Sequence, residues 1–338
     1  MSGLLEPSQV GKKEDLLDVL TIVDYKNLTL LSSISRGSTP RNTYLEWPVD
    51  DYSDPNPSGV VDGTDVTSYE NHAQNRALLS TYLQTFRRAA KVSRLSQEVS
   101  DVAGVTDEIS NAVMKKGVEL NRDIEAALLS SQEHQAEDGT NPYLTRGLGT
   151  WILDTTNIAG QTLLQVPANY RPSDGQVINT AAASLDETAI QNLLKAGFDN
   201  VGSPQGNLVL IAGSTLRRAF TDFTRTIDSG GSNTFEATRN FNFDGNSETV
   251  KNTTSFYQGD YGLIEIRSSS FIGWSGGAPD LDRGYILDMD KVSLRWNKQP
   301  EVERFDDQGG GPRFMIEARC ALQCSNPKGL YQIQPGLS

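Results

Sequence analysis

One stretch of the chain, from Val105 to Gln135, constrains the fold more than any other. Thr106 is placed to cap the start of a helix, and Asp107 and Glu108 put negative charge in the first turn, where the helix dipole favours it. An unbroken helix would be about 45 Å long, at about 1.5 Å per residue, so we expect it to span the subunit. The apolar residues recur at close to the 3.6-residue period of a helix with one buried stripe: Val105, Ile109, Ala112, Val113, Leu120, Ile124, Ala127 and Leu128.

Two features inside this stretch modify its stability. Lys115 and Glu119 lie one turn apart on the expected exposed side, where such a pair adds a few tenths of a kcal/mol. Gly117 lies between them, and a glycine in a helix interior costs about 1 kcal/mol relative to alanine. We therefore expect a long helix with a weakened middle.

Composition and charge exclude several classes of protein. At 338 residues the chain exceeds a typical single domain, so we expect two lobes or one lobe with long excursions. Mean hydropathy is −0.43, and no apolar run reaches the roughly 18 residues of a membrane span. The first residues lack the apolar core of a signal peptide, so we expect the chain to stay in the cytosol where it is made. The net charge of −13 repels phosphate backbones, which argues against a general nucleic-acid binder.

Cysteine and histidine give no support for a metal centre. Cys320 and Cys324 fall on one predicted strand, about 13 Å apart on the same face, too far for a disulfide. We interpret them as free buried thiols. His72 and His134 have no ligand spacing to each other or to the cysteines, so a zinc site is not supported.

Paired aspartates in predicted turns offer the oxygen ligands that divalent cations prefer. Solvated turn carboxylates are the simpler interpretation, and we assign no metal and no cofactor. The pairs are Asp280 with Asp282 and Asp288 with Asp290, and a weaker candidate is the run Asp244–Glu248.

The first ninety residues predict an arm and a two-stranded ribbon. Strand-like residues at Thr43–Trp47 are followed by a Pro-, Gly- and Asp-rich loop and then by a strand from Leu79 to Val92. Both faces of that second strand are mixed. Because a two-stranded ribbon with little apolar area is marginal alone, we expect it to be ordered by a neighbouring subunit, with hydrogen exchange changing most on assembly at Asn42–Thr67.

A new region begins after the helix, near Trp151. It opens with a compact helix, strand, helix unit, continues through a long loop at Asp228–Thr254, and ends in strands that we interpret as an antiparallel sheet. The predicted helices are Leu185–Phe198 and Ser214–Phe223, and the predicted strands are Leu208–Ala212, Tyr261–Arg267, Gly284–Leu287, Val292–Trp296 and Arg313–Cys324.

Catalytic signatures are absent. The chain has no GxxxxGK[ST] phosphate loop, no GxSxG elbow, no HExxH and no strand-coupled GxGxxG, so no catalytic residue is assigned. The basic cluster Arg87, Arg88, Lys91 and Arg94 lies on alternating strand faces. We expect it to pair with carboxylates of a neighbouring chain rather than with phosphates.

The order of these parts resembles the major capsid proteins of tailed bacteriophages, which have the α+β Hong Kong 97-like fold. The segments that carry the resemblance are Thr43–Trp47 (TYLEW), Phe86–Ser93 (FRRAAKVS), Lys115–Leu129 (KKGVELNRDIEAALL), Thr145–Trp151 (TRGLGTW) and Asn207–Phe223.

This resemblance implies a division of the chain and a function. Residues 1–38 would be an N-terminal arm and 39–92 an extended loop; 93–141 with 309–338 would form a peripheral domain around the spine helix, and 142–308 an axial domain. The protein would self-assemble into hexamers and pentamers of an icosahedral head around double-stranded DNA, with a separate scaffolding protein, a portal and possible decoration protein as partners. It would be assembled in the host cytoplasm and end in the virion, with DNA as a nonspecific neighbour and no membrane.

The resemblance also implies where subunits meet and how the shell is locked. Intersubunit contacts would come from Arg41, Tyr44, Trp47, Arg76, Arg87, Arg88 and Arg94. The founding member of the fold links subunits covalently from a loop lysine to a neighbour's asparagine. This chain has no lysine between Lys26 and Lys91 to attack an asparagine such as Asn326, so we expect noncovalent contacts only. Some forty residues precede the ribbon, and we expect no assembly domain to be cleaved from them.

Two other classes of function stay open at this point. Another phage structural protein, of a tail or decoration type, would lack a spine helix crossing a sheet. An enzyme without a recognisable motif would show a deep pocket holding charged residues with perturbed pKa values.

Overall fold

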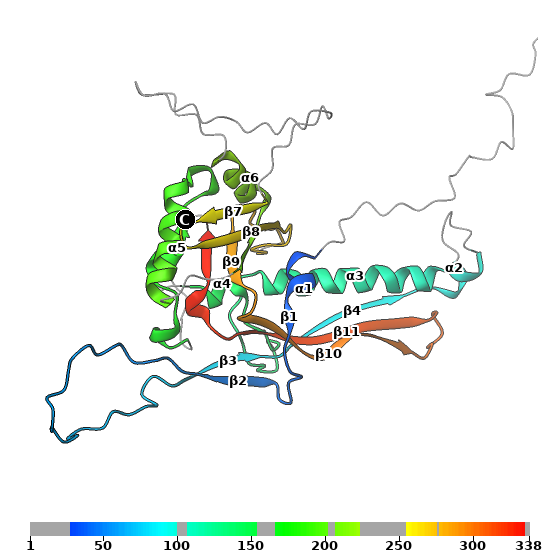
Figure 1. Cartoon of the computed structure of the whole chain (residues 1–338). Coiled ribbons are helices and arrows are strands. Elements are labelled where there is room, and N and C mark those ends of the chain that lie inside the picture. Colours follow the sequence, from blue (N-terminus) through cyan, green and yellow to red (C-terminus); the bar gives the residue numbers. More distant parts are fainter. Residues whose placement is uncertain are drawn as a thin grey trace, which may run out of the picture.

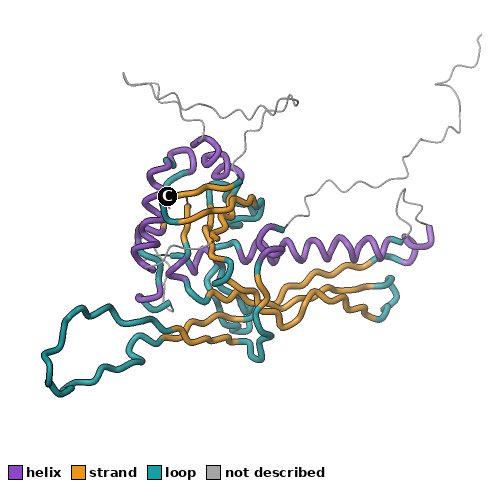
Figure 2. Tube along the Cα trace, in the orientation of Figure 1, coloured by secondary structure: helices purple, strands orange, loops and turns teal. Residues whose placement is uncertain are grey.

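A computed structural model describes residues 28–99, 107–153, 166–201, 207–223, 255–275 and 277–334. Figure 1 shows a compact α/β lobe, a long helix lying beside an elongated sheet, and a thin loop that projects away from both. Figure 2 shows that this projecting loop has almost no regular structure beyond the two strands at its root. Several sequence predictions fall outside the described residues: the cap at Thr106, the arm up to residue 27, the loop at 228–254 and the run DGNSE.

The long helix is α3, Glu108–Leu128, and it is shorter than the pattern predicted. Asp107 caps it, because its carboxylate accepts a hydrogen bond from the backbone N–H of Ile109 at 2.9 Å. At the other end the Ser130 hydroxyl donates to the carbonyl of Ala127 at 2.7 Å, satisfying a terminal acceptor and closing the helix. At about 1.5 Å per residue the helix is about 30 Å long rather than 45 Å. The ion pair on the helix also differs from the expected one: the half-buried Lys116, not Lys115, bonds Glu119 at 2.7 Å.

The helix packs on a four-stranded sheet, and the two lie side by side in Figure 1. Leu120, Ile124 and Leu128 are fully buried in one apolar cluster with sheet residues such as Phe314 and Ile316. The order of strands is β1-β10-β11-β4, with a short parallel β1 and antiparallel neighbours elsewhere. Their bounds are β1 Ser35–Arg36, β10 Val292–Phe305, β11 Arg313–Cys324 and β4 Gln84–Lys91.

The strand predicted at Leu79–Val92 is two strands, and this corrects the expected ribbon. β3 (Ala77–Tyr82) pairs with β2 (Tyr44–Val49), whereas β4 pairs with β11. The break comes at buried Leu83, whose N–H bonds the Thr43 carbonyl at 2.8 Å. The strand pairing therefore ends the ribbon at Tyr82. The expectation of little buried area was also wrong for β2 and β3, where Leu45, Trp47, Leu79 and Thr81 are buried.

The second lobe is built on a six-stranded mixed sheet. The helix, strand, helix unit is confirmed as α5 (Glu187–Val201), β6 and α6 (Ser214–Phe223). The strands of the last third pair antiparallel with one another, as predicted. The six-stranded sheet is mixed because earlier strands join it in parallel, β6 beside β8 and β5 beside β12. The order is β5-β12-β9-β6-β8-β7, with β5 Val177–Asn179, β12 Tyr331–Gln334, β9 Gly284–Asp288, β6 Asn207–Ala212, β8 Gly262–Ser268 and β7 Phe256–Gly259.

Strand pairing also redistributes the C-terminal third between the two sheets. β10, expected in the axial part, belongs to the sheet under α3, while β12, expected in the peripheral part, belongs to the second lobe. Each sheet is thus completed by residues distant in the chain. The remaining helices are short: α1 Thr29–Ser33, α2 Arg94–Val99, α4 Leu148–Trp151, and the 3-10 turns Ala168–Tyr170, Asp174–Gln176, Ala182–Ser184 and Pro327–Gly329.

The prediction of free buried thiols is confirmed. Cys320 and Cys324 are buried and unbonded to each other. Burial raises the pKa of each thiol to about 12, so neither is a thiolate at neutral pH.

Gly117 gives a direct test of the helix. A Cβ added there would meet only the Cδ1 of Ile316, at 3.9 Å, which is an ordinary contact. Gly117→Ala will therefore raise the free energy of unfolding by about 0.5–1 kcal/mol, since alanine has the higher helix propensity and no clash offsets it. Chemical denaturation of the isolated subunit measures this. A loss of stability would show that the glycine has a packing role.

Candidate assembly interface

The loop at residues 50–76, between β2 and β3, is the most exposed part of the described chain. It presents apolar side chains to solvent on a segment that carries no core of its own. Tyr52 is 97% exposed and Tyr69 is 88% exposed, and Val60, Val61 and Val66 are also largely exposed. A cluster of this kind marks a surface that another molecule covers.

The same loop is strongly acidic. Against the single arginine Arg76, which bonds Asp50 at 3.2 Å, it carries six carboxylates: Asp50, Asp51, Asp54, Asp62, Asp65 and Glu70. Its outer hydrogen bonds are internal, such as Thr64 Oγ1 to the Val61 carbonyl at 2.7 Å. A partner surface for this loop must therefore combine apolar area with positive charge.

The root of the ribbon is fixed to the body by aromatic side chains. Trp47 is buried, lies 5.7 Å from Trp151 between ring centroids, and donates its indole N–H to the Cys324 carbonyl at 3.1 Å. Tyr44 lies 4.9 Å from the ring of Tyr82. Trp47 is thus a core residue of its own chain, with little surface left for a neighbour.

The predicted contact arginines hold carboxylates of their own chain. Arg88 bonds both oxygens of Asp123, at 2.5 and 2.6 Å, which ties β4 to α3. Arg94 bonds Asp307 at 2.6 Å across the far end of the sheet. Arg41 is exposed just before β2. These residues are spread along the molecule rather than gathered at one site, and their roles between subunits stay predictions.

Arg87 contacts the most buried of these carboxylates. It bonds Glu317 on β11 at 2.9 Å, and the Glu317 side chain is only 3% exposed. Burial alone would raise the pKa of Glu317, yet the hydrogen bond from Arg87 and the charges of Arg319 and Lys298 bring it below its ordinary value. The carboxylate is therefore held ionised in the sheet, which makes this group structural.

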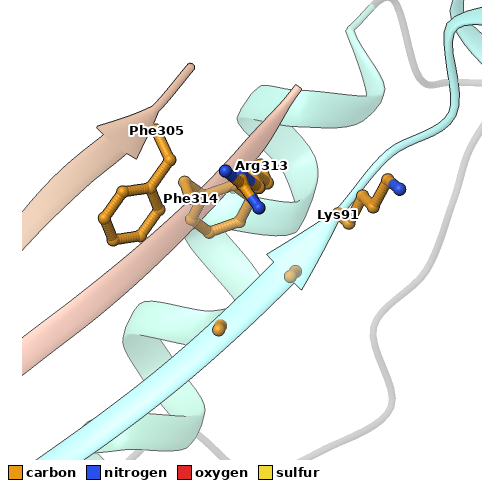
Figure 3. A pocket seen from close by; sticks show the side chains of 6 residues that line it. Lys91, Phe305, Arg313 and Phe314 are labelled. Atoms are coloured by element: carbon orange, nitrogen blue, oxygen red, sulfur yellow. The ribbon is translucent and has the colours of Figure 1, made fainter. Parts of the chain in front are cut away.

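A basic and aromatic hollow lies at the far end of the same sheet (Figure 3). It measures about 600 Å³, and Phe305 and Phe314 line it together with Lys91 and Arg313. The Arg313 guanidinium lies 5.9 Å from the centre of the Phe305 ring, and Phe305 is 44% exposed. No carboxylate lines this hollow. It therefore offers an acidic, apolar segment both charge and contact area.

Sequence reasoning missed three of the four basic and aromatic residues that line this hollow. Lys91 was grouped with the basic cluster. Arg313 and Phe314 fell at the start of a predicted strand and Phe305 in the loop before it, without any local signal. They meet because β10 and β11 pair antiparallel, with Phe305 opposite Arg313. A prediction would have needed the strand register.

The paired aspartates hold no candidate metal centre in the part of the chain that the structure describes. No group of three or more metal-ligating side chains is found among the described residues, and no described helix has the length and apolarity of a membrane span. Asp280 bonds Arg283 at 3.3 Å, and Asp288 accepts the N–H of Asp290 at 3.1 Å, as turn carboxylates do.

A model of the SU10 major capsid protein family matches residues 6–335, nearly the whole chain. The chain belongs to this family. No curated protein sequence matches this capsid protein. The assignment agrees with the resemblance drawn from the helix segment and the flanking motifs.

Solved capsid structures share the fold of this capsid protein. The cyanophage A-1(L) capsid protein is 12% identical and superposes with a TM-score of 0.64 over 96% of both chains. The capsid protein of cyanophage P-SCSP1u is 12% identical, with a TM-score of 0.58 over 99% of this chain and 98% of that one. A chain from the capsid of a native GTA particle is 11% identical, with a TM-score of 0.60 over 98% of this chain and 97% of that one. These likenesses confirm the Hong Kong 97-like α+β fold.

The family decides between the classes that the sequence left open. The protein is a major capsid protein of a tailed phage, a structural component of the virion, and not an enzyme. A capsid protein associates with copies of itself into capsomers. The exposed loop and the basic hollow are therefore candidate surfaces between copies.

Proposed function

We propose that this capsid protein forms hexamers and pentamers of an icosahedral head around double-stranded DNA, and that residues 50–76 of one copy lie on the basic hollow of a neighbour. The observation that carries this proposal is the match between the two surfaces. The loop has six carboxylates and exposed Tyr and Val side chains, while the hollow has two cations and the half-exposed ring of Phe305.

Electrostatics favour this arrangement at moderate ionic strength. Loop and hollow carry opposite charge, which steers association, and burial of the exposed apolar groups supplies the affinity. Charge pairs at a rim are screened over about 8 Å at physiological salt, so assembly by this route will weaken as salt rises.

We further propose a division of the chain that follows the strand pairing. The arm ends at β1, the extended loop comprises β2, β3 and the residues between them, and the peripheral part comprises α3 with β4, β10 and β11. The axial part comprises the six-stranded sheet with α5 and α6. This keeps the four parts inferred from the sequence and moves their boundaries to where the sheets change.

The remaining partners are inferred from the protein's role. A separate scaffolding protein, a portal and a decoration protein would complete a head assembled in the host cytoplasm. The acidic balance of the chain suits an inner wall along which packaged DNA moves without sticking. Arg41, Tyr44 and Arg76 lie at the root of the loop, and they would contact the neighbouring subunit on which that loop lies.

Reversing the charge of the hollow tests the proposal. The double variant Lys91→Glu/Arg313→Glu will lower the yield of closed shells at 0.1 M salt at least tenfold, because it places two carboxylates opposite an acidic loop. Electron microscopy and sedimentation count the shells. Thermal unfolding of the subunit checks that the variant is folded.

Two matched variants make the result specific. Lys91→Arg/Arg313→Lys keeps both charges and will assemble like the natural chain. Adding Asp62→Lys and Asp65→Lys to the reversed hollow will restore shells, since each copy then carries both inverted surfaces. Normal yield from the reversed hollow alone would contradict the proposed contact.

A further inference from the structure

Among the described residues, the loop at residues 50–76 is hydrogen-bonded to the second lobe at its base. Within the described part of the chain, the hydrogen bonds of residues 52–74 stay inside the loop, as in Ser58 to Asn56 at 3.0 Å and Ala73 to Asn71 at 3.1 Å. Between the loop and the second lobe lies an open hollow of about 830 Å³, lined among others by Asn56, Glu70 and Arg171. The loop is therefore not laid against the lobe along its length.

Two contacts bridge that gap, one from each leg of the loop. Asp51, two residues past the end of β2, bonds the ammonium of Lys328 at 3.1 Å. On the other leg, the carbonyl of Asn75 accepts a hydrogen bond from the Tyr170 hydroxyl at 2.6 Å. Asn75 also donates from its side chain to the Asp51 carbonyl at 3.4 Å, which ties the legs together. We name these four residues the latch.

The two latch residues on the second lobe, Tyr170 and Lys328, are held in place by short turns that pack together. Tyr170 ends the 3-10 turn Ala168–Tyr170 and is 5% exposed, while Lys328 lies in the turn Pro327–Gly329. These two turns lie against each other. Burial, with the nearby charges of Asp51 and Asp50, raises the pKa of Tyr170 above its ordinary value, so the hydroxyl keeps the proton that it donates.

Because the loop is long, a small rotation at its base moves its tip by a large distance. A leg of about 12 extended residues reaches about 40 Å at about 3.3 Å per residue, so a swing of about 10° at the base displaces the tip by about 7 Å. Among the described hydrogen bonds and ion pairs, the latch opposes such a swing beyond the ends of β2 and β3, where the Trp47 anchor no longer holds the chain.

We propose that Lys328 and Tyr170 are positioning residues that set the direction of the extended loop, and through it the angle between neighbouring subunits. This inference rests on the proposed docking of the loop on a neighbour. It assigns to the latch the curvature of the shell rather than the strength of the contact, because Tyr170 and Lys328 lie on the second lobe and not in the loop that docks.

The latch can be removed without unfolding the subunit. Tyr170→Phe and Lys328→Met each delete one polar contact and keep the apolar bulk of the side chain. An exposed ion pair such as Asp51–Lys328 contributes roughly 0–1 kcal/mol, so the melting temperature of the subunit will change little. The double variant will still assemble, and its particles will spread over several diameters and open forms where the natural chain gives one diameter.

A charge swap and a distance measurement complete the test. Asp51→Lys/Lys328→Asp recreates the pair in reverse and will restore a single diameter. On isolated subunits, spin labels at Ser53→Cys, near the latch, and Lys195→Cys, on α5, will give a broader distance distribution in the double variant than in the natural background. The buried native cysteines stay unlabelled because their thiol pKa values are about 12.

The outcomes separate this inference from the proposed function. Uniform shells of the natural diameter, or an unchanged distance distribution, from Tyr170→Phe/Lys328→Met would overturn the latch while leaving the docking proposal intact. If reversing Lys91 and Arg313 leaves assembly unchanged while the distance distribution still broadens, the docking site falls and the latch remains as a loop-positioning device.

Discussion

Replacing residues 54–72 by a short Gly-Asn turn will give a folded capsid protein that no longer assembles. The excised segment makes no described contact with the core, while β2 and β3 keep their pairing and the Trp47 anchor. Assembly will fall at least 100-fold, equivalent to about 2.8 kcal/mol. The variant loses the exposed side chains of Tyr69 and of three valines, together with four of the six carboxylates. Circular dichroism and thermal unfolding will show whether the variant is folded, and electron microscopy will show whether it assembles.

A second measurement on the natural chain checks the same point. Hydrogen exchange of assembled shells and of isolated subunits will differ most at residues 50–67, the part of the predicted segment Asn42–Thr67 that lies beyond β2. These amides have few partners in the subunit and gain them only from a neighbour. Closed shells from the excised variant, or equal protection in both states, would show that the loop is not an assembly element.

Replacing Glu125 with alanine will lower the free energy of unfolding by about 2 kcal/mol. Glu125 on α3 is fully buried and accepts the backbone N–H of Leu30 at 2.9 Å and that of Leu31 at 2.7 Å. These donors belong to the first turn of α1, whose N-cap residue Leu28 provides no side-chain cap. A buried donor left without an acceptor costs roughly 1–3 kcal/mol, partly offset here by removing a buried charge. Denaturation gives the stability, and loss of exchange protection at Leu30 and Leu31 localises it.

The pH dependence of the unfolding free energy shows how much the ionisation of Glu125 contributes to stability. Burial raises the pKa of this carboxyl above its ordinary value of 4.5, against the hydrogen bonds from α1 that lower it. A raised pKa in the folded state means that the folded chain binds the proton more tightly. The stabilising contribution is therefore complete below about pH 4.5 and is lost as pH rises through the raised value. The unfolding free energy of the natural chain minus that of Glu125→Gln will decline over this window. A flat difference would show that the carboxyl keeps its ordinary pKa.

Local patterns predicted most of the elements of this fold. The helix segment, the helix, strand, helix unit and the strand Arg313–Cys324 were found from their periodicities, because a 3.6-residue or two-residue alternation records which face of one element is buried. The ends of the helix were wrong since side chains outside the pattern set them, with Asp107 at the start and Ser130 at the end. The sequence motifs in and around the spine helix were sufficient to predict the protein family.

The candidate surfaces depended on information that local patterns do not hold. Alternation predicted that Arg87 and Arg88 point to opposite faces of a strand, but not that Glu317 and Asp123 of the same chain would meet them. The split of residues 79–92 between two sheets was missed for the same reason, because both strands have similar alternation and only their partners differ.

By itself, the sequence determined the class of fold, the long amphipathic helix, the acidic exposed loop and the absence of a lysine in that loop. Only the tertiary structure decided which residues meet: Phe305 with Arg313 at the tip of the sheet, Glu125 with the first turn of α1, and Asp51 with Lys328, 277 residues away. The physical reason is that burial and turn propensities act on neighbours along the chain. Contacts between distant residues are set by strand register and packing, which depend on all the elements at once.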